Sequence, residues 1–140
     1  MAVKIADTDE ALRSIAPVLL QLRPDFTEES LIAQIKRQAL SGFQIAYLEA
    51  EGRPVCVAGF IPCEKLAWGK SLYIDDLVTD ETYRSHGAGK RMLDWFKTFA
   101  RENGYGQIHL DSRNIRLDAH RFYVREGFSK DGFHFTFKDF

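Results

Sequence analysis

The sequence predicts an α/β fold with a mixed, mostly antiparallel central sheet flanked by about four helices. Apolar residues recur at helical spacing near both ends of the chain, whereas residues 43–78 alternate and are rich in β-branched and aromatic side chains. Glycines and prolines occur singly between these stretches, so no linker or repeat divides the chain of 140 residues. We therefore expect one domain over residues 1–140.

The first predicted elements are a short strand at residues 3–5 and two helices. Asp7, Thr8 and Asp9 are candidate N-caps for the first helix and Thr27 for the second, which Gly42 ends. Both helices carry apolar residues at three- and four-residue intervals, which are Leu12, Ile15, Leu19 and Leu22 on the first helix and Leu31, Ile35 and Ala39 on the second.

The middle of the chain predicts an antiparallel meander. Its strands are expected at residues 43–50, 55–61 and 71–78, where β-branched and aromatic residues are concentrated. Turn-forming residues at 51–54 and 67–69 separate the three strands. Short turns of this kind join neighbouring antiparallel strands.

The rest of the chain returns to alternating helices and strands. We expect a helix at residues 88–103, a strand at 107–111 and a helix at about 117–126. A final pair of strands is predicted around Phe128 and at residues 133–137. The predicted order is β-α-α-β-β-β-α-β-α-β-β.

Composition excludes several classes of protein. Nineteen Lys+Arg and twenty Asp+Glu give a formal charge of −1, which argues against a general nucleic-acid binder. No apolar run reaches the ~18–20 residues of a membrane span, and the first nine residues lack the pattern of a signal peptide. With only Cys56 and Cys63, the chain has no disulfide framework. We therefore predict a cytoplasmic protein without a membrane or nucleic-acid partner.

The strongest local motif is Arg-Ser-His-Gly-Ala-Gly at residues 84–89, between a predicted strand and a predicted helix. A helix N-terminus attracts anions, and the two glycines let the backbone approach a phosphate closely. A Walker A loop would need Gly and Ser or Thr where Arg84 and Arg91 stand, and a Rossmann motif would need Gly at Met92. The alternative is a tight strand-to-helix turn without a ligand.

In this context the motif resembles the pyrophosphate-binding motif of the GNAT N-acetyltransferase superfamily, because it follows a strand that ends in Asp-Leu-Val-Thr at residues 76–79. A second segment, Ala-His-Arg-Phe-Tyr-Val-Arg-Glu-Gly-Phe at residues 119–128, resembles a later helix of the same family. Within the family, residues 119–123 and the closing His134 and Phe135 look most like the aminoalkylphosphonate N-acetyltransferase branch.

The resemblance implies an N-acetyltransferase that uses acetyl-CoA, with the sheet splayed at the cofactor strand. A backbone N–H near Leu77 or Val78 is then expected to stabilise the oxyanion. The resemblance assigns cofactor binding to the strand end and the loop, which are Leu77, Val78, Thr79, Arg84, Ser85, His86, Gly87, Ala88, Gly89 and Lys90. Two positions depart from the family pattern: Ser85 replaces a common Gly, and Arg116 replaces a common Asn.

Asp75 and Asp76 are the acidic candidates for handling the acceptor amine. An alkyl ammonium with a pKa of ~10 is almost fully charged at pH 7, so it must lose a proton before attack. Strand alternation sends the two side chains to opposite faces, and Asp76 stands where relatives often carry an acid. We expect it to act through a water relay or by attracting the cation. The alternative is that one aspartate pairs with an arginine and the other is solvated.

Tyr123 is the candidate general acid. A phenol with a pKa of ~10 can share a proton with a departing thiolate, whose own pKa is ~8.5. The match to the family's Phe-Tyr helix favours this role. The alternative is a core tyrosine that packs beside Phe122.

No metal is predicted, although His109 and Asp111 share one face of a strand. His120 and His134 are isolated in the sequence, and no pair has the close spacing of metal ligands. Cys56 lies in a predicted strand without a nearby histidine, so we expect it to pack in the core rather than act as a nucleophile.

The acceptor amine and the oligomeric state stay open. An anionic amine such as an aminophosphonate would suit Arg37, Arg53, Arg113 and Arg116. A polyamine or aminoglycoside would suit Asp75, Asp76, Glu28 and Glu29. A small-molecule amine is the preferred acceptor, with a peptide or protein amine and a non-catalytic CoA-binding module as alternatives. A nucleotide phosphotransferase rests only on Gly89 and Lys90. Exposed C-terminal strands would favour a homodimer.

Overall fold

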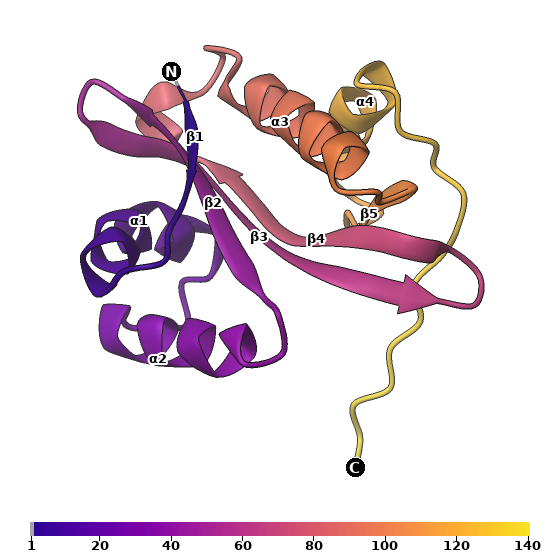
Figure 1. Cartoon of the computed structure of the whole chain (residues 1–140), viewed down its shortest axis with the longest axis horizontal. Helices are drawn as coiled ribbons and strands as arrows, with labels where there is room; N and C mark the ends of the chain where they lie inside the picture. Colours follow the sequence, from indigo (N-terminus) through magenta and orange to yellow (C-terminus); the bar gives the residue numbers. More distant parts are fainter. Residues whose placement is uncertain (1) are drawn as a thin grey trace. The chain divides into compact units, whose positions relative to one another are not determined.

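Five strands form the central sheet, in the spatial order β1-β2-β3-β4-β5. In the computed structural model, which describes residues 2–140, the strands are β1 (Val3–Ile5), β2 (Gln44–Ala50), β3 (Arg53–Lys65), β4 (Gly69–Thr79) and β5 (Gln107–Leu110) (Figure 1). The β1–β2, β2–β3 and β3–β4 pairs are antiparallel. The predicted mixed, mostly antiparallel sheet is confirmed.

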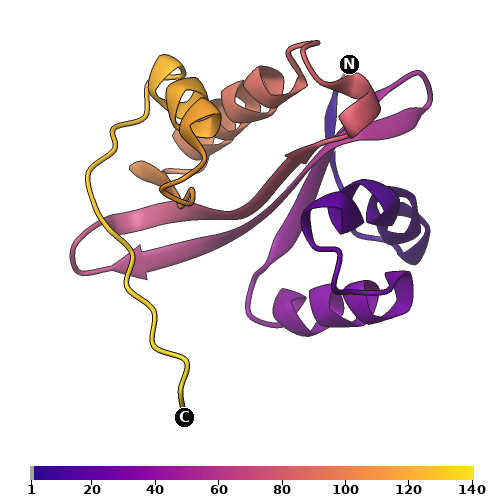
Figure 2. The ribbon, with the colours of Figure 1, turned by 180° about the vertical axis from the view of Figure 1, so that it is seen from behind.

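The four predicted helices are also confirmed. They are α1 (Asp9–Leu22), α2 (Glu28–Ala39), α3 (Ala88–Glu102) and α4 (Leu117–Arg125), with one short 3-10 helix, η1 (Glu81–Tyr83), before the Gly-rich loop. Helices α1 and α2 lie on one face of the sheet, and α3 lies on the other, as Figure 2 shows from behind. No helix within residues 2–140 has the length and apolarity that a membrane crossing needs.

Side-chain caps determine where α1 and α2 begin. The Thr8 hydroxyl accepts a hydrogen bond from the N–H of Ala11 at 3.1 Å. Thr27 and Ser30 form a reciprocal capping box, in which the backbone N–H of each residue donates to the hydroxyl of the other. Caps of this kind each stabilise a helix by about 1 kcal/mol. They also fix the ends of the loop that connects the two helices.

The sheet buries apolar side chains on both faces. On the α1 and α2 side, the buried cluster includes Ile15, Leu19, Ile35, Phe43, Ile45, Tyr47, Val57 and Val78. On the α3 side, the fully buried ring of Phe60 meets Phe96 edge to face, with 4.9 Å between the ring centroids. Trp95 and Phe99 make similar contacts with Phe60. The two faces of the sheet therefore differ in the side chains that β3 contributes, which include Val57 on the α1 and α2 face and Phe60 on the α3 face.

The chain divides into two compact units, Met1–His109 and Leu110–Phe140. Strands β1 to β4 and helices α1 to α3 belong to the first unit, α4 belongs to the second, and β5 crosses the boundary after His109. The single domain expected over residues 1–140 stays a prediction, and Met1 lies outside the described residues.

The predicted final pair of strands, around Phe128 and at residues 133–137, is wrong. After α4 the chain has no helix or strand. The side chains of Phe133, Phe135 and Phe137 are 84%, 92% and 69% exposed. Their alternation indicates a strand, but a strand forms only where a neighbouring edge accepts its hydrogen bonds, and the described residues provide none here.

Candidate functional site

A β-bulge in β4 determines where the two aspartates point. In the β3–β4 register, Phe60 is opposite Ile74 and Gly59 is opposite Asp76, so Asp75 is one extra residue without a partner in the ladder. A bulge interrupts the regular alternation of side chains along its strand.

The bulge turns Asp76 toward α1 and α2. Ile74 pairs with Phe60, whose ring packs against α3, whereas Val78 pairs with Val57 in the cluster under α1 and α2. Opposed residues point to the same face, and Asp76 lies one pleat before Val78. The expectation that Asp75 and Asp76 occupy opposite faces is therefore wrong, because the extra residue breaks the alternation.

Both aspartates line one cleft between α1, α2 and β4. The cleft has a volume of about 170 Å³. Its lining residues are Leu19, Arg23, Phe26, Leu31, Gln34, Ile35, Gln38, Phe43, Asp75 and Asp76. The acidic end of the cleft is thus formed by β4, and the two helices contribute most of its apolar wall.

Arg23, at the end of α1, holds Asp76 in this cleft. Its Nε donates to Asp76 Oδ1 at 2.8 Å, and its Nη2 donates to the carbonyl oxygen of Asp75 at 3.2 Å. The Asp76 side chain is 15% exposed and that of Arg23 is 45% exposed. The alternative that one aspartate pairs with an arginine is therefore observed for Asp76. Sequence reasoning missed Arg23, because 53 residues separate it from its partner.

Gly59 provides the space that the Asp76 carboxylate occupies. A Cβ atom at Gly59 would lie 2.6 Å from Asp76 Oδ2 and 2.5 Å from Cζ of Phe43. Both distances are too short for any side chain at this position. Gly59 therefore positions Asp76, another contribution that no local sequence pattern indicated.

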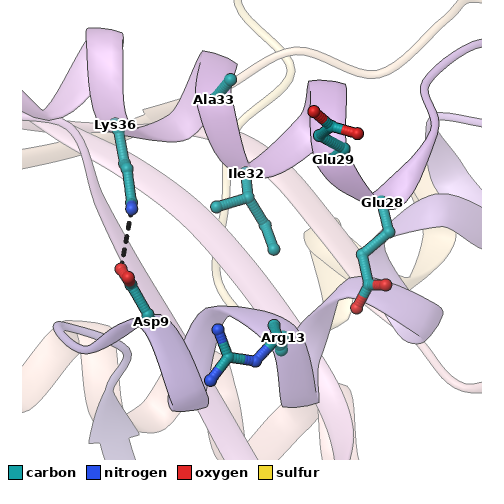
Figure 3. Close-up of a pocket in the computed structure, with 7 residues that line it drawn as sticks. All are labelled: Asp9, Arg13, Glu28, Glu29, Ile32, Ala33 and Lys36. Carbon is teal, nitrogen blue, oxygen red and sulfur yellow. Dashed lines mark ion pairs between the residues drawn. The ribbon is translucent and has the colours of Figure 1, made fainter.

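A second hollow lies between α1 and α2 and shares no lining residue with this cleft. Figure 3 shows Asp9 and Arg13 of α1 facing Glu28, Glu29, Ile32, Ala33 and Lys36 of α2. Lys36 bridges to Asp9 at 2.7 Å, and its hydrogen bond holds the pKa of the Asp9 carboxyl below its ordinary value. The two glutamates are thus separated from Asp75 and Asp76.

The loop at residues 84–89 leads into α3 with an open backbone. Gly87 is the N-cap of α3 with φ +78°, and no side chain caps this helix end. The N–H of Arg91 donates a hydrogen bond to the Gly87 carbonyl at the start of α3. The N–H groups of Ala88 and Gly89 come earlier in the chain and therefore have no acceptor within the helix. A Cβ atom at Gly87 would meet no atom within 4 Å. The backbone and the space in front of it fit a phosphate group.

The side chains of the predicted loop residues surround this backbone. Ser85 adopts φ +68°, a left-handed conformation that favours glycine. His86 Nδ1 lies 2.8 Å from the Arg84 carbonyl oxygen, and Arg84 itself is exposed. Lys90 contacts Asp94 at 3.3 Å along the surface of α3. Arg84 and Lys90 therefore add positive charge near the start of the helix.

Asp80 anchors the segment between β4 and the loop. Its carboxylate accepts hydrogen bonds from the Gln21 side chain at 3.1 Å and from the Thr82 N–H at 3.2 Å, and it pairs with Arg53. The hydrogen bond from Gln21, together with those from Thr82 and Arg53, lowers the pKa of Asp80 to about 2 against the cost of burial. Asp80 joins α1, β3 and η1, and sequence reasoning missed it.

Within residues 2–140, no strand pairs with the outer edge of β4 near Leu77, Val78 and Thr79. The Gly106 N–H donates to the Lys70 carbonyl at 2.8 Å, which places the start of β5 beside the start of β4. Because β5 has four residues and β4 has eleven, β5 cannot extend to the last residues of β4. The splay predicted at this strand end has room to form.

Tyr123 lies on α4, in the unit Leu110–Phe140. Its ring is half-buried between Phe122, at 5.2 Å between centroids, and Phe128, at 5.9 Å edge to face. These contacts agree with the alternative of a packing tyrosine as well as with a positioned phenol. Its role as general acid therefore stays a prediction.

The other reactive side chains form no second catalytic cluster. Within residues 2–140, no group of three His, Cys, Asp or Glu side chains is arranged to hold a metal ion. His134 Nδ1 lies 3.4 Å from Asp111 Oδ2 as a pair. Cys56 is buried, and desolvation raises the pKa of its thiol to about 11, so it is not a nucleophile at neutral pH.

The fold and the site define a class of protein: an α/β fold in which β4 lines a cleft with two aspartates and is followed by a Gly-rich loop and the uncapped start of α3. The chain belongs to the GNAT acetyltransferase family, whose profile matches residues 9–128, and it is an N-acetyltransferase of that family. Members of this family typically use acetyl-CoA.

Relatives by sequence agree with this family. The chain is 33% identical over 124 residues to the "Uncharacterized N-acetyltransferase YhdJ" of Bacillus subtilis (strain 168), and the match covers 85% of each chain. It is 38% identical over 63 residues to the aminoalkylphosphonate N-acetyltransferase of Salmonella typhimurium, which covers 45% of this chain and 41% of that enzyme.

Solved structures agree with the fold. A ribosomal-protein-alanine N-acetyltransferase from Brucella melitensis biovar Abortus 2308 has a TM-score of 0.84 at 13% identity, with 99% of this chain and 100% of that chain covered. A probable acetyltransferase has a TM-score of 0.83 at 20% identity, with 99% of each chain covered. At these identities the likeness shows the fold alone.

Proposed function

We propose that this protein transfers an acetyl group from acetyl-CoA to a primary amine of a small molecule, by direct attack of the amine on the thioester. The observation that carries the proposal is the open start of α3 together with a cleft that Asp75 and Asp76 line on the preceding strand. Both features belong to the unit Met1–His109, and β4 leads from the cleft to the loop.

The loop residues would hold the pyrophosphate of the cofactor. The amides of Gly87, Ala88 and Gly89 present N–H donors at the positive end of the α3 dipole. Arg84 and Lys90 add charge, while Ser85, His86, Leu77, Val78 and Thr79 complete the binding surface that the family likeness assigns. When bound, acetyl-CoA supplies an activated acyl group as a thioester.

The remaining chemistry falls to the backbone of β4 and to three side chains. A free N–H of Leu77 or Val78 at the uncovered edge would stabilise the developing oxyanion. Asp76, with Asp75 beside it, would attract the ammonium group and accept its proton through water. The Tyr123 phenol would return a proton to the departing thiolate.

Measuring free thiol tests the proposal. Acetyl-CoA mixed with the protein and a broad panel of primary amines should release thiol in proportion to the acetylated amine. Binding of CoA without thiol release, across small amines and peptides alike, would instead favour a non-catalytic CoA-binding module.

A glycine variant tests the pyrophosphate loop separately. Gly87→Val forces a β-branched residue into φ +78° and should weaken CoA binding by at least ~10-fold in calorimetry, because the amides move. Gly52→Val is the matched control, since Gly52 has φ +76° in the β2–β3 turn and equally open surroundings. Equal loss of CoA binding in both variants would contradict the role of the loop.

We also propose a homodimer formed by antiparallel pairing of residues 133–137 from two chains. With Phe135 of one chain opposite Phe135 of the other, Phe133 of each chain would lie opposite Phe137 of its partner. Three pairs of exposed phenylalanine side chains would then pack together. Light scattering should give twice the chain mass for the natural protein and one chain mass for Phe135→Asp. Leu66→Asp is the control, a fully exposed position outside residues 133–137, and a natural protein that is monomeric at all concentrations would refute the dimer.

We propose the cytoplasm as the site of the reaction. The support is that both cysteines are free thiols, which reducing compartments maintain. Cell fractionation checks this, and recovery in an oxidising compartment would contradict it.

A further inference from the structure

Resting on the proposed function, we propose that the acceptor is a primary amine with a single positive charge and an apolar carbon body. Its ammonium group binds at the Asp75 and Asp76 end of the cleft, and its body lies along the wall formed by α1 and α2. Arg23 is the specificity-determining residue, because its charge limits the acidic end to one net negative charge.

The charges along the cleft set this preference. Three of its ten lining residues are charged, namely Arg23, Asp75 and Asp76, which leaves one net negative charge. One ammonium group matches that charge. The guanidinium is already held by the Asp76 carboxylate and the Asp75 carbonyl, so an anionic acceptor would face a surplus of negative charge.

The charged residues that would favour other acceptors lie elsewhere. Arg53 pairs with Asp80, and Glu28 and Glu29 line the second hollow. Arg113 and Arg116 belong to the unit Leu110–Phe140. Arg37 donates to the Gln34 side chain, whose amide lines the cleft. Of these residues only Arg37 reaches the cleft, through Gln34, so neither an anion site of several arginines nor a polycation site of several further acids surrounds the cleft.

The apolar wall determines the body of the acceptor. Half of the lining residues are apolar, namely Leu19, Phe26, Leu31, Ile35 and Phe43. Burying an uncharged carbon chain against them is favourable, whereas a second charged group at the far end would lose hydration without a partner. An alkyl or arylalkyl monoamine places its ammonium group at the acidic end of the cleft and its carbon chain against the apolar wall.

Three acceptors with the same six-carbon chain isolate the effect of charge. These are hexylamine, 1,6-diaminohexane and 6-aminohexanoate, compared by kcat/KM for thiol release at saturating acetyl-CoA, with 2-aminoethylphosphonate as a fourth amine. Hexylamine should exceed each of the others by at least ~10-fold. Equal or better turnover of 6-aminohexanoate, 2-aminoethylphosphonate or the diamine would overturn the inference and leave the proposed function standing.

Measuring how tightly each amine binds distinguishes a wrong acceptor class from a wrong reaction. Hexylamine should bind to the protein saturated with CoA in calorimetry, more tightly than the other three amines. If it does so but no amine releases thiol, the acceptor class holds and the proposed function fails. If hexylamine does not bind, the inference fails.

Arg23→Gln tests the specificity-determining residue. Removing its charge leaves two negative charges in the cleft, so the ratio of diamine to hexylamine kcat/KM should rise by ~10-fold. Arg13→Gln is the matched control, because Arg13 lies on the same helix and lines the second hollow (Figure 3). An unchanged ratio in Arg23→Gln, with circular dichroism like that of the natural protein, would overturn the role of Arg23.

Asp75→Asn provides a second test that does not disturb the ion pair. Loss of one negative charge leaves the cleft neutral, so the advantage of hexylamine over 6-aminohexanoate should fall by ~5- to 10-fold. Glu64→Asn is its control, an exposed acid on β3 outside the cleft. An unchanged ratio for Asp75→Asn would count against the ammonium position.

Discussion

The unit Met1–His109 buries its large apolar side chains, whereas the unit Leu110–Phe140 exposes them. Every buried apolar residue lies at or before Ala100. Seven of the nine large exposed apolar side chains belong to the second unit, and Glu126 is its one buried residue within the described chain. A segment below ~40 residues rarely folds without further support.

This difference distinguishes the proposed functional residues by the packing of the elements that carry them. The loop, Asp76 and Arg23 are built on elements with dense packing, which holds them in place. Tyr123 sits on a helix without a buried apolar residue of its own. Binding functions should therefore tolerate changes in the second unit, while the proton-donating function should not.

The largest expected effect tests the difference in packing directly. Phe60→Ala should lower the free energy of unfolding by about 3–5 kcal/mol, because it leaves a cavity between β3 and α3. Phe135→Ala, at an exposed position, should change it by less than about 0.5 kcal/mol. Urea denaturation measures both, and similar losses would show that the second unit is as tightly packed as the first.

Tyr123→Phe tests whether the second unit contributes to chemistry. We expect kcat to fall by ~10²-fold while CoA affinity stays unchanged, because only proton donation is removed. Tyr105→Phe, a tyrosine that stacks on Phe99 in the first unit, is the control. Equal small effects in both variants would support the packing role of Tyr123.

Asp80→Asn tests the anchor of the loop. Loss of its charged hydrogen bonds should lower the free energy of unfolding by about 2 kcal/mol at pH 7. Because the pKa of Asp80 is about 2 in the folded protein, below its ordinary 3.8, its contribution is present above pH ~4 and is lost as the pH falls toward 2. The variant should therefore approach the natural protein in acid, and a constant difference across this window would contradict the assignment. Asp94→Asn is an exposed control.

Gly59→Ala tests the space around Asp76. The added Cβ would press on both the carboxylate and the Phe43 ring, so stability should fall by about 1–3 kcal/mol. The kcat/KM for the amine should fall by ~10-fold with unchanged CoA affinity. Gly106→Ala is the matched control, because its nearest atom would lie at 3.9 Å. An amine kcat/KM that follows the control would refute the positioning role.

Ser85→Gly should have the smallest effect. Glycine relieves the left-handed φ of +68° but gains freedom in the unfolded chain, so stability should change by less than about 1 kcal/mol. CoA affinity, measured by calorimetry, should stay within a factor of about three. A large loss would indicate that the serine side chain itself binds the cofactor.

Features with local signals were predictable from the sequence. Thr27 is found as the expected cap of α2, and the cap of α1 is Thr8, one of three neighbouring residues with a suitable side chain. The three central strands and four helices were also anticipated, because their periodicity reflects burial on one face or stripe.

Features that depend on distant pairing could not be predicted. Arg23 contacts Asp76 only because α1 ends beside β4, and the bulge at Asp75 exists only in relation to Gly59 on β3. The C-terminal alternation of Phe133, Phe135 and Phe137 predicted a strand, yet nothing in the residues themselves says whether an edge is present to pair with it.

The bulge at Asp75 makes this one position of β4 dispensable for the pairing of the residues around it. A substitution at position 75 leaves the pleat after it unchanged, since the unpaired residue contributes no ladder position. Deleting Asp75 would remove the bulge but leave Ile74 opposite Phe60 and Asp76 opposite Gly59, so the Asp76 carboxylate would still point toward α1 and α2. Homologues that share this cleft are thus expected to vary or lack the residue at position 75 while keeping Asp76 opposite Gly59.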